Sequence, residues 1–185
     1  MQKGPLKLNL GCGTHILPGW INIDSAALPG VNLVHDLNVL PLPYADASVD
    51  EIFAENIFEH LDYIPLLREC HRLLIPGGRL RLEVPHFTSV NNFADPTHRN
   101  RFSIRTFNFF CGATYEGSLD RGYYFDFKFS KIAERRIRFY KRSIYAFNSL
   151  IEGLVNQSLS MQMFYEATGF SRLFPAMNIR LTLVK

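Results

Sequence analysis

The sequence is poor in several features that would have defined its class. Its three cysteines, Cys12, Cys70 and Cys111, form no CxxC pair and are an odd number, which predicts reduced thiols and supports neither a disulfide framework nor a cysteine zinc site. No apolar run is long enough for a signal peptide or a membrane span, so we expect a cytoplasmic protein. Repeats and low-complexity tracts are also absent. With 185 residues, 47% of them hydrophobic, the chain is predicted to be one globular domain, 1–185.

Phosphate-binding glycine loops are missing as well. The chain contains no Gly-Lys-Ser/Thr sequence, and the position where a dinucleotide fingerprint needs its third glycine is Ile16. It does contain Gly11 and Gly13 directly after the apolar run 6–10, and Asp24 closes the next β-type run. Glycine lets a ligand approach the backbone, and one carboxylate can accept hydrogen bonds from two ribose hydroxyls. We therefore predict a site for a nucleoside that needs no phosphate clamp.

Short β-type runs alternate with helical runs through the first half, which predicts βαβ units and a parallel sheet. The ranges with strand character are 6–10, 20–24, 31–36, 49–55, 79–85, 131–141 and 178–185, and the helical ranges are 63–74 and 143–159. Only residues 11–19 separate the first two strands, and Pro18 and Gly19 are among them. The usual first helix must therefore shrink to about one turn.

Four successive segments resemble the motifs of class I S-adenosylmethionine-dependent methyltransferases. They are "LNLGCG" (8–13), Asp24, "HDLNVLPLPYADASVDEIFAENIFEHL" (35–61) and "LLRECHRLLIPGGRLRLEVP" (66–85). The resemblance covers residues 6–110 and is closest to small methyltransferase-domain proteins with "GCG…PGWINID…" and a later "DPTHR…F". It implies an enzyme of the α/β class, a Rossmann-like three-layer sandwich with a mostly parallel seven-stranded sheet and an antiparallel last strand. It also implies S-adenosylmethionine as cofactor and S-adenosylhomocysteine as product.

The resemblance further implies a set of cofactor-binding residues, by position in this chain: Leu10, Gly11, Cys12, Gly13, Asp24, Asp36, Leu37, Asn56 and His60. The glycine loop would lie under the methionine part of the cofactor, Asp24 would bind the ribose hydroxyls, and Asp36 would hold the adenine amino group. Asn56 would face the methionine end, with Glu59 and His60 opening the next helix nearby. The residues alone leave other interpretations open, because Asp24 and Asp36 also suit turns and Glu59 suits a solvated first helical turn.

Residues 86–130 lose periodicity and are rich in aromatic side chains, which predicts an insertion or lid; alternatively these aromatics cap the core. The candidates to shield an acceptor are Phe87, Phe93, Phe102 and Tyr124. His86, Asp95 and His98 follow the strand at 79–85 and are the candidate catalytic residues, because ligands gather at the carboxyl ends of parallel strands. Asp95 also suits a turn or cap. These three have no recognised metal-ligand spacing, so we predict no metal site.

The net charge of +3 conceals a basic segment. Residues 95–142 hold 11 Lys/Arg against 5 Asp/Glu, most densely in 134–142, which suits either a solvated face or attraction of an anionic acceptor. We predict a small-molecule or saccharide acceptor and no nucleic-acid partner, since no RNA-binding appendage is recognisable. Three alternatives stay open: a non-catalytic protein that keeps the cofactor site, an RNA-modifying methyltransferase and a nicotinamide-dependent oxidoreductase. The sequence leaves the oligomeric state undetermined.

Overall fold

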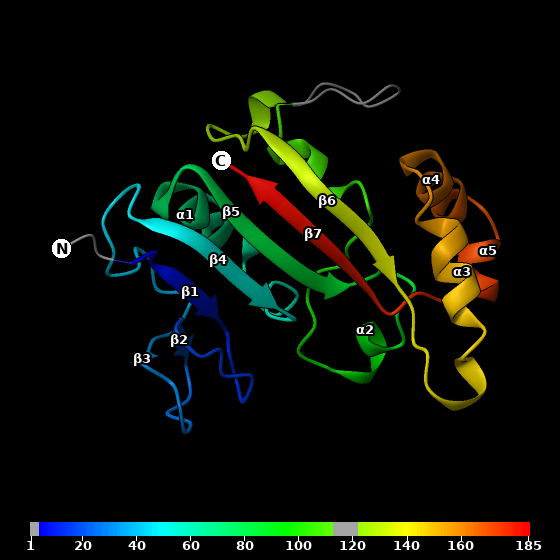
Figure 1. Cartoon of the computed structure of the whole chain (residues 1–185), viewed down its shortest axis with the longest axis horizontal. Helices are drawn as coiled ribbons and strands as arrows, with labels where there is room; N and C mark the ends of the chain where they lie inside the picture. The colour runs from blue at the N-terminus through cyan, green and yellow to red at the C-terminus, as the bar shows by residue number, and fades with distance from the viewer. Residues whose placement is uncertain (1–3, 113–121) are drawn as a thin grey trace.

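The computed structural model of the chain describes residues 4–112 and 122–185 (Figure 1). Its seven strands are β1 (Lys7–Leu10), β2 (Ile21–Asp24), β3 (Leu33–Val34), β4 (Val49–Glu55), β5 (Leu74–Pro85), β6 (Lys131–Arg138) and β7 (Asn178–Val184). They form one sheet in the order β3-β2-β1-β4-β5-β7-β6. The first five strands pair in parallel, and β7 runs antiparallel to both of its neighbours. The predicted α/β, Rossmann-like sheet with an antiparallel last strand is confirmed.

The helices are short and lie late in the chain. They are α1 (Tyr63–Leu73), α2 (Asn91–Ala94), α3 (Asn148–Val155), α4 (Leu159–Ala167) and α5 (Phe170–Leu173), with 3-10 turns η1 (Thr106–Phe110), η2 (Gly122–Tyr124) and η3 (Ser143–Tyr145). In Figure 1, α3, α4 and α5 gather beyond the edge strand β6. Among the described residues, none of these helices combines the length and the apolar character needed to span a bilayer. The three cysteines are free and buried.

The prediction of one helix over 143–159 is wrong, because Asn156 ends the first helix and Ser158 caps the start of a second one. Asn156 follows α3 and turns its amide group to β6, where it accepts a hydrogen bond from the Ile137 N–H (2.8 Å) and donates to the Ile137 carbonyl (2.8 Å). Ser158 then caps α4, since its hydroxyl accepts the N–H of Met161 (3.2 Å). The chain therefore forms two helices that both meet β6.

Alternate residues divide the sheet into an apolar and a polar face. Residues paired across neighbouring strands lie on the same face. The apolar face consists of Leu8, Leu10, Ile23, Ile52, Ala54, Leu80, Leu82, Leu181 and Leu183, all buried. The opposite face carries Lys7, Glu51, Phe53, Arg81, Glu83 and Arg180. A sheet with such alternation has one face packed on the core and one face lined by polar groups.

Charged and aromatic side chains cover the polar face where a first helix would lie. Glu51 bridges Lys7 (Oε2 to Nζ, 3.1 Å) and Arg81 (Oε1 to Nε, 2.8 Å). Trp20, from the connection after β1, packs against both cations, with Lys7 Nζ 5.3 Å and Arg81 Cζ 5.5 Å from the ring centroid. Residues 11–20 contain only turns and bends. At this point the helical layer expected on this face is thus replaced by the Trp20 side chain, which covers the ion pairs of Glu51 with Lys7 and Arg81.

Buried asparagines replace the hydrogen bonds that the first helix would have supplied. Asn22 donates from Nδ2 to the carbonyls of Leu17 (3.2 Å) and Trp20 (3.2 Å), and its Oδ1 accepts the N–H of Leu17 (2.9 Å). Asn9, opposite it on β1, donates to the carbonyl of His15 (2.8 Å) and to Asn22 Oδ1 (2.9 Å). Buried backbone groups need such partners. The two side chains explain how ten residues can complete a parallel crossover without a helix.

Part of the aromatic segment belongs to the core. The ring of Tyr63, on α1, lies 5.3 Å from that of Phe102 and 6.3 Å from those of Phe107 and Phe110, and these three phenylalanines are buried. Two of the four lid candidates, Phe93 and Tyr124, are exposed, whereas Phe87 is half-buried and Phe102 is a core residue. Residues 113–121 of the segment lie outside the described residues, and closure over an acceptor stays a prediction.

Replacing Asn22 with alanine should be strongly destabilising, because it removes hydrogen-bond partners from backbone groups of Leu17 and Trp20 and from the buried amide of Asn9. We expect the free energy of unfolding to fall by about 2–4 kcal/mol, measured by urea denaturation. Asn38→Ala is the matched control, since Asn38 is exposed and bonds only to the nearby Asp36; it should cost less than about 0.5 kcal/mol. Equal stability of the two variants would contradict the proposed role of the asparagine pair.

Candidate functional site

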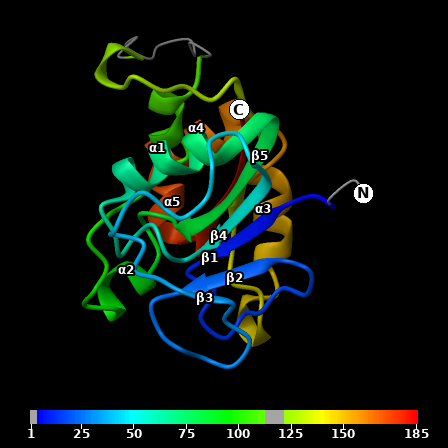
Figure 2. The same cartoon turned by 90° about the vertical axis from the view of Figure 1, so that its left-hand side faces the viewer.

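The carboxyl ends of β1 to β5 meet at one edge of the sheet (Figure 2). The parallel pairing places the glycine turn after β1 at this edge, together with residues that end or follow the other four strands. These are Asp24, Asp36, Asn56 and His86. Open parallel sheets bind ligands at this edge, and these four predicted site residues end or follow strands there.

The two glycines of the turn have different tasks. Gly11 has φ +62°, and a Cβ atom there would lie 2.5 Å from Cγ1 of Ile57, so it must be glycine for packing within the protein. Gly13 has φ +49°, and a Cβ atom on it would meet nothing within 4 Å. Between them Cys12 is buried and donates its N–H to the carbonyl of Ile23 (3.0 Å). Gly13 is therefore the position at which open space reaches the backbone.

Asp24 links the end of β2 to this turn. Its Oδ2 accepts the N–H of Gly13 (2.7 Å) and its Oδ1 accepts the N–H of Ala26 (2.9 Å). A carboxylate has about four acceptor positions, so two positions are left for other donors. The turn and the acid, which are 11 residues apart, form one unit. This is the pairing that the glycine pattern and Asp24 predict together.

The other predicted cofactor residues lie on either side of this unit. Asp36 is exposed and accepts from the N–H (2.9 Å) and Nδ2 (3.0 Å) of Asn38, which forms a turn, while the neighbouring Leu37 is buried. Asn56 is exposed, has φ +50°, and accepts a hydrogen bond from Asn178 of β7 (3.2 Å). Leu10 is a buried strand residue. Their contacts to a cofactor stay a prediction.

Four ionisable side chains converge where the turn after β4 meets the segment after α2. His98 Nε2 lies 3.7 Å from Asp95 Oδ2 and 4.0 Å from Glu59 Oε1, and the rings of His60 and His98 pack edge to face at 4.7 Å. Burial raises the pKa of Glu59 to about 7. Burial also lowers the pKa of His98, whereas hydrogen bonds from Thr97 lower the pKa of Asp95.

Backbone hydrogen bonds clamp these two segments together. The carbonyl of Glu59 accepts the N–H groups of Arg99 (2.7 Å) and Asn100 (3.2 Å). The side chain of Asn100 donates to the carbonyls of Phe58 (3.0 Å) and Leu61 (2.7 Å). Glu59 therefore lies in a turn, and the expectation that it opens the next helix is wrong because α1 begins at Tyr63.

His86 stands apart from that cluster. It is fully buried; its Nδ1 accepts the N–H of Thr88 (3.2 Å), so its Nε2 carries the proton donated to Glu166 Oε1 (3.1 Å). Glu166, on α4, also accepts the N–H of Ile104 (2.6 Å) and the hydroxyl of Ser103 (2.9 Å). His86 thus ties α4 to the end of β5. To act as a base it would have to give up one of these bonds, and its catalytic role stays a prediction.

The basic run 134–142 is partly neutralised within the fold. Arg138 and Lys141 both pair with Oε1 of Glu152 on α3 (3.2 and 2.9 Å), and Arg135 donates to Asn108 (2.6 Å). This arrangement weakens the argument that the run attracts an anionic acceptor, because two of its cations share one carboxylate.

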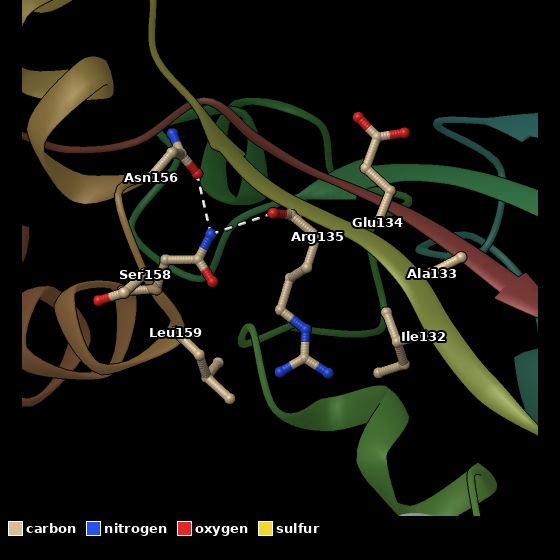
Figure 3. A pocket seen from close by; sticks show the side chains of 8 residues that line it. Ile132, Ala133, Glu134, Arg135, Asn156, Ser158 and Leu159 are labelled. Atoms are coloured by element: carbon tan, nitrogen blue, oxygen red, sulfur yellow. Dashed lines mark hydrogen bonds between the residues drawn. The ribbon is translucent and has the colours of Figure 1, made fainter.

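A hollow of about 290 Å³ lies beside the same strand, where β6 meets α4 (Figure 3). Within it Gln162 Nε2 donates to the carbonyl of Arg135 (3.1 Å) and to Asn156 Oδ1 (2.9 Å). These polar groups bind one another and hold α4 to the sheet edge. The hollow lies on the edge strand opposite β3 in the sheet order, away from the glycine turn.

The sequence analysis missed the proximity of Glu59 and His60 to His98. The separate signals were visible, since "EH" follows one predicted parallel strand and "DPTH" follows the next. Adjacent parallel strands end at the same edge, so residues after β4 and β5 must approach one another. The spacing of 38 residues between the two histidines hides the cluster from any search for local metal-ligand motifs.

Comparisons with known proteins agree with this geometry. Residues 11–82 match the family model described as a methyltransferase domain. A stretch of 84 residues is 36% identical to a Mycolicibacterium smegmatis protein described as "Probable S-adenosylmethionine-dependent methyltransferase"; it covers 45% of this chain and 32% of that protein. The chain thus spans about a third of the length of the curated relative it matches.

Two solved structures have a similar fold. A SAM-dependent methyltransferase from Archaeoglobus fulgidus has a TM-score of 0.58 at 17% identity, over 99% of this chain and 87% of that chain. An S-adenosylmethionine-dependent methyltransferase from Mesorhizobium loti has a TM-score of 0.55 at 14% identity, over 97% of this chain and 90% of that chain. At such low identity these likenesses establish the fold alone.

Alanine substitutions at the two glycines should separate the packing clash at Gly11 from the backbone strain that both positions share. Gly11→Ala should destabilise the protein by about 2–4 kcal/mol, because overpacking against Ile57 adds to the strain of a positive φ. Gly13→Ala should cost only the strain, about 1–2 kcal/mol. Urea denaturation measures both.

The double-mutant comparison uses Ile57→Ala as background. There the added cost of Gly11→Ala should fall toward that of Gly13→Ala, because the contacts with Cγ1 and Cδ1 of Ile57 are removed and only the contact with its Cβ (2.8 Å) remains. If the cost of Gly11→Ala were the same in both backgrounds, the packing explanation would fail.

Proposed function

We propose that this chain, whose residues 11–82 match the methyltransferase-domain model, transfers a methyl group from S-adenosylmethionine to a small-molecule or saccharide acceptor. The observation that carries the proposal is the unit formed by Asp24 and the glycine turn. An acid at the end of β2 touches a backbone N–H beside open space, at the edge where parallel sheets bind nucleosides.

The residues fit the cofactor group by group. Asp24 keeps acceptor positions for two ribose hydroxyls, and the space at Gly13 accommodates a ligand against the backbone. Asp36 offers a carboxylate to an adenine amino group beside the apolar Leu37. Asn56 supplies an exposed amide for the methionine end. The cofactor carries no phosphate, which agrees with a glycine turn that contains no Gly-Lys-Ser/Thr sequence.

When bound, the cofactor supplies an electrophilic methyl group on a sulfonium. The task of the chain is then to orient the acceptor and exclude water. We propose that Asp95 and His98 serve an acceptor that needs proton removal, since both lie at the carboxyl edge in the cluster with Glu59. His98 keeps a neutral ring at neutral pH because burial lowers its pKa, as a base requires.

The RNA-modifying alternative rests on the basic run alone. Its distinguishing property is binding of total RNA that weakens steeply as salt rises, which a neutral small acceptor would not show. The internal pairing of Arg138 and Lys141 with Glu152 favours the small-molecule acceptor. A non-catalytic protein would instead bind the cofactor and transfer methyl groups to none of a panel of acceptors.

Asp24→Asn should weaken affinity for S-adenosylhomocysteine at least tenfold, about 1.4 kcal/mol, because the neutral amide loses the charge-assisted bonds to the ribose. Calorimetric titration measures the affinity. Asp126→Asn is the control: Asp126 is an exposed acid paired with Arg68 on α1, and its loss should leave the affinity unchanged. Unchanged affinity in Asp24→Asn, in a protein that unfolds like wild type, would remove Asp24 from the site.

A further inference from the structure

Glu59, beside the proposed base His98, has no task in the proposed methyl transfer, and the metal site proposed here would use His98 as a ligand instead of a base. Glu59, His60 and His98, which we call the Glu59 cluster, each offer one ligand atom, and these atoms all lie within 4.8 Å of one another. We propose that the Glu59 cluster binds a divalent first-row transition metal ion, in the range from Mn²⁺ to Zn²⁺. Two imidazoles and one carboxylate are a donor set that suits such ions.

The first observation is a buried carboxylate without a partner. The Glu59 side chain is fully buried, and neither of its oxygens has a hydrogen-bond partner among residues 4–112 and 122–185. The nearest basic atom, Nε2 of His98, is 4.0 Å away, which is too far for a hydrogen bond. An unpaired buried charge is costly, and a protonated carboxyl would still leave its O–H without an acceptor. A bound cation would supply the missing counter-charge.

The second observation concerns the state of the His60 ring. The hydroxyl of Thr97 donates its hydrogen to Asp95 Oδ1 (2.6 Å), so the contact between Thr97 Oγ1 and His60 Nδ1 (2.8 Å) must be donated by the ring. Nε2 of His60 then carries the free lone pair that a metal requires. Metal-binding histidines generally donate their other N–H to such an outer partner, which fixes the tautomer and the ring orientation.

The second histidine of the cluster, His98, also has a ring nitrogen without a hydrogen-bond partner among the residues that the structure describes. The Nδ1 of His98 is buried and lacks a hydrogen-bond partner within the described part of the chain. Its Nε2 lies 3.7 Å from Asp95 Oδ2 and 4.0 Å from Glu59 Oε1, so the ring faces the unpartnered carboxylate. A histidine Nδ1 and two glutamate oxygens that are buried without hydrogen-bond partners in the described part of the chain are better explained by a shared ion than by two separate defects.

The fold holds the cluster in place without using the ligand atoms. The backbone clamp between Glu59 and residues 99–100 fixes the two segments by main-chain hydrogen bonds. Ligand atoms on one ion lie roughly 3–4 Å apart, given metal–ligand distances of about 2.0–2.2 Å. Small side-chain rotations would therefore close the cluster around an ion. Three protein ligands leave a position open, and the binding of an acceptor oxygen there is a consequence that rests on the proposed function.

The test measures metal binding by the whole chain, free of any affinity tag and stripped with a chelator. We expect wild type to bind one equivalent of Zn²⁺ or Co²⁺ in calorimetry, with the Co²⁺ visible spectrum reporting nitrogen and oxygen ligands. Glu59→Gln and His98→Ala should weaken binding at least 100-fold. Thr97→Val, which removes the outer partner of His60 and changes an exposed residue, should weaken it by about 10–100-fold.

His35→Ala is the control for adventitious binding, because His35 lies outside the cluster and contacts the carbonyl of Val39 (2.7 Å); its metal affinity should equal that of wild type. Circular dichroism of each metal-free variant checks its fold. Absence of stoichiometric binding by wild type, or equal affinity in folded Glu59→Gln, would overturn the proposal. Titration of the metal-free protein with S-adenosylhomocysteine tests the proposed function separately, so the two can fail independently.

Discussion

Parallel pairing of β1 with both β2 and β4 is the constraint on which the rest of the molecule depends. It brings the glycine turn, Asp24 and the residues after β4 to a single edge, although they are distant in sequence. The pairing requires a crossover within ten residues, and the crossover requires Asn9 and Asn22 to satisfy its backbone. Two buried amides in the sheet are therefore a condition for the geometry of the proposed nucleoside site beside them.

The edge divides into two halves that the fold builds differently. The half at β1 and β2 is a backbone turn held by a carboxylate, which suits a ligand with hydroxyl and amino groups. The half at β4 and β5 consists of buried ionisable side chains on two clamped segments, which suits a cation or a proton transfer. A group-transfer site needs both kinds of environment next to each other, one to hold the donor and one to prepare the acceptor.

The features predictable from the sequence are those with a short period or a fixed local pattern. Strand β4 was predicted with its observed bounds, and the apolar stripe of 63–74 marks α1, because both patterns report burial directly. The alternation in "RLRLEV" also predicts a sheet with one apolar and one polar face, although a three-layer arrangement was expected. The signal was present, but the resemblance to a family outweighed it.

What could not be predicted depends on contacts between distant segments. The break in the range 143–159 arises from Asn156, which binds to β6, and a sequence window cannot show that bond. The meeting of Glu59 with His98 depends on the clamp between their segments. The proximity of Asp24 to the glycine turn could be anticipated, because both lie at the ends of neighbouring parallel strands. Long-range polar contacts thus account for most of the difference between expectation and structure.

The ladder of Lys7, Glu51 and Arg81 under Trp20 has a consequence for how this chain can change over evolutionary time. Along β5, residues 80, 82 and 84 are buried in the apolar core, whereas Arg81 and Glu83 on the other side each pair with a charge on a neighbouring strand. Mutational drift on that side can exchange one ion pair for its reverse without disturbing the interior. One side of the sheet is thus constrained by the shape of an apolar core, and the other by charge pairing and by the buried amides of Asn9 and Asn22.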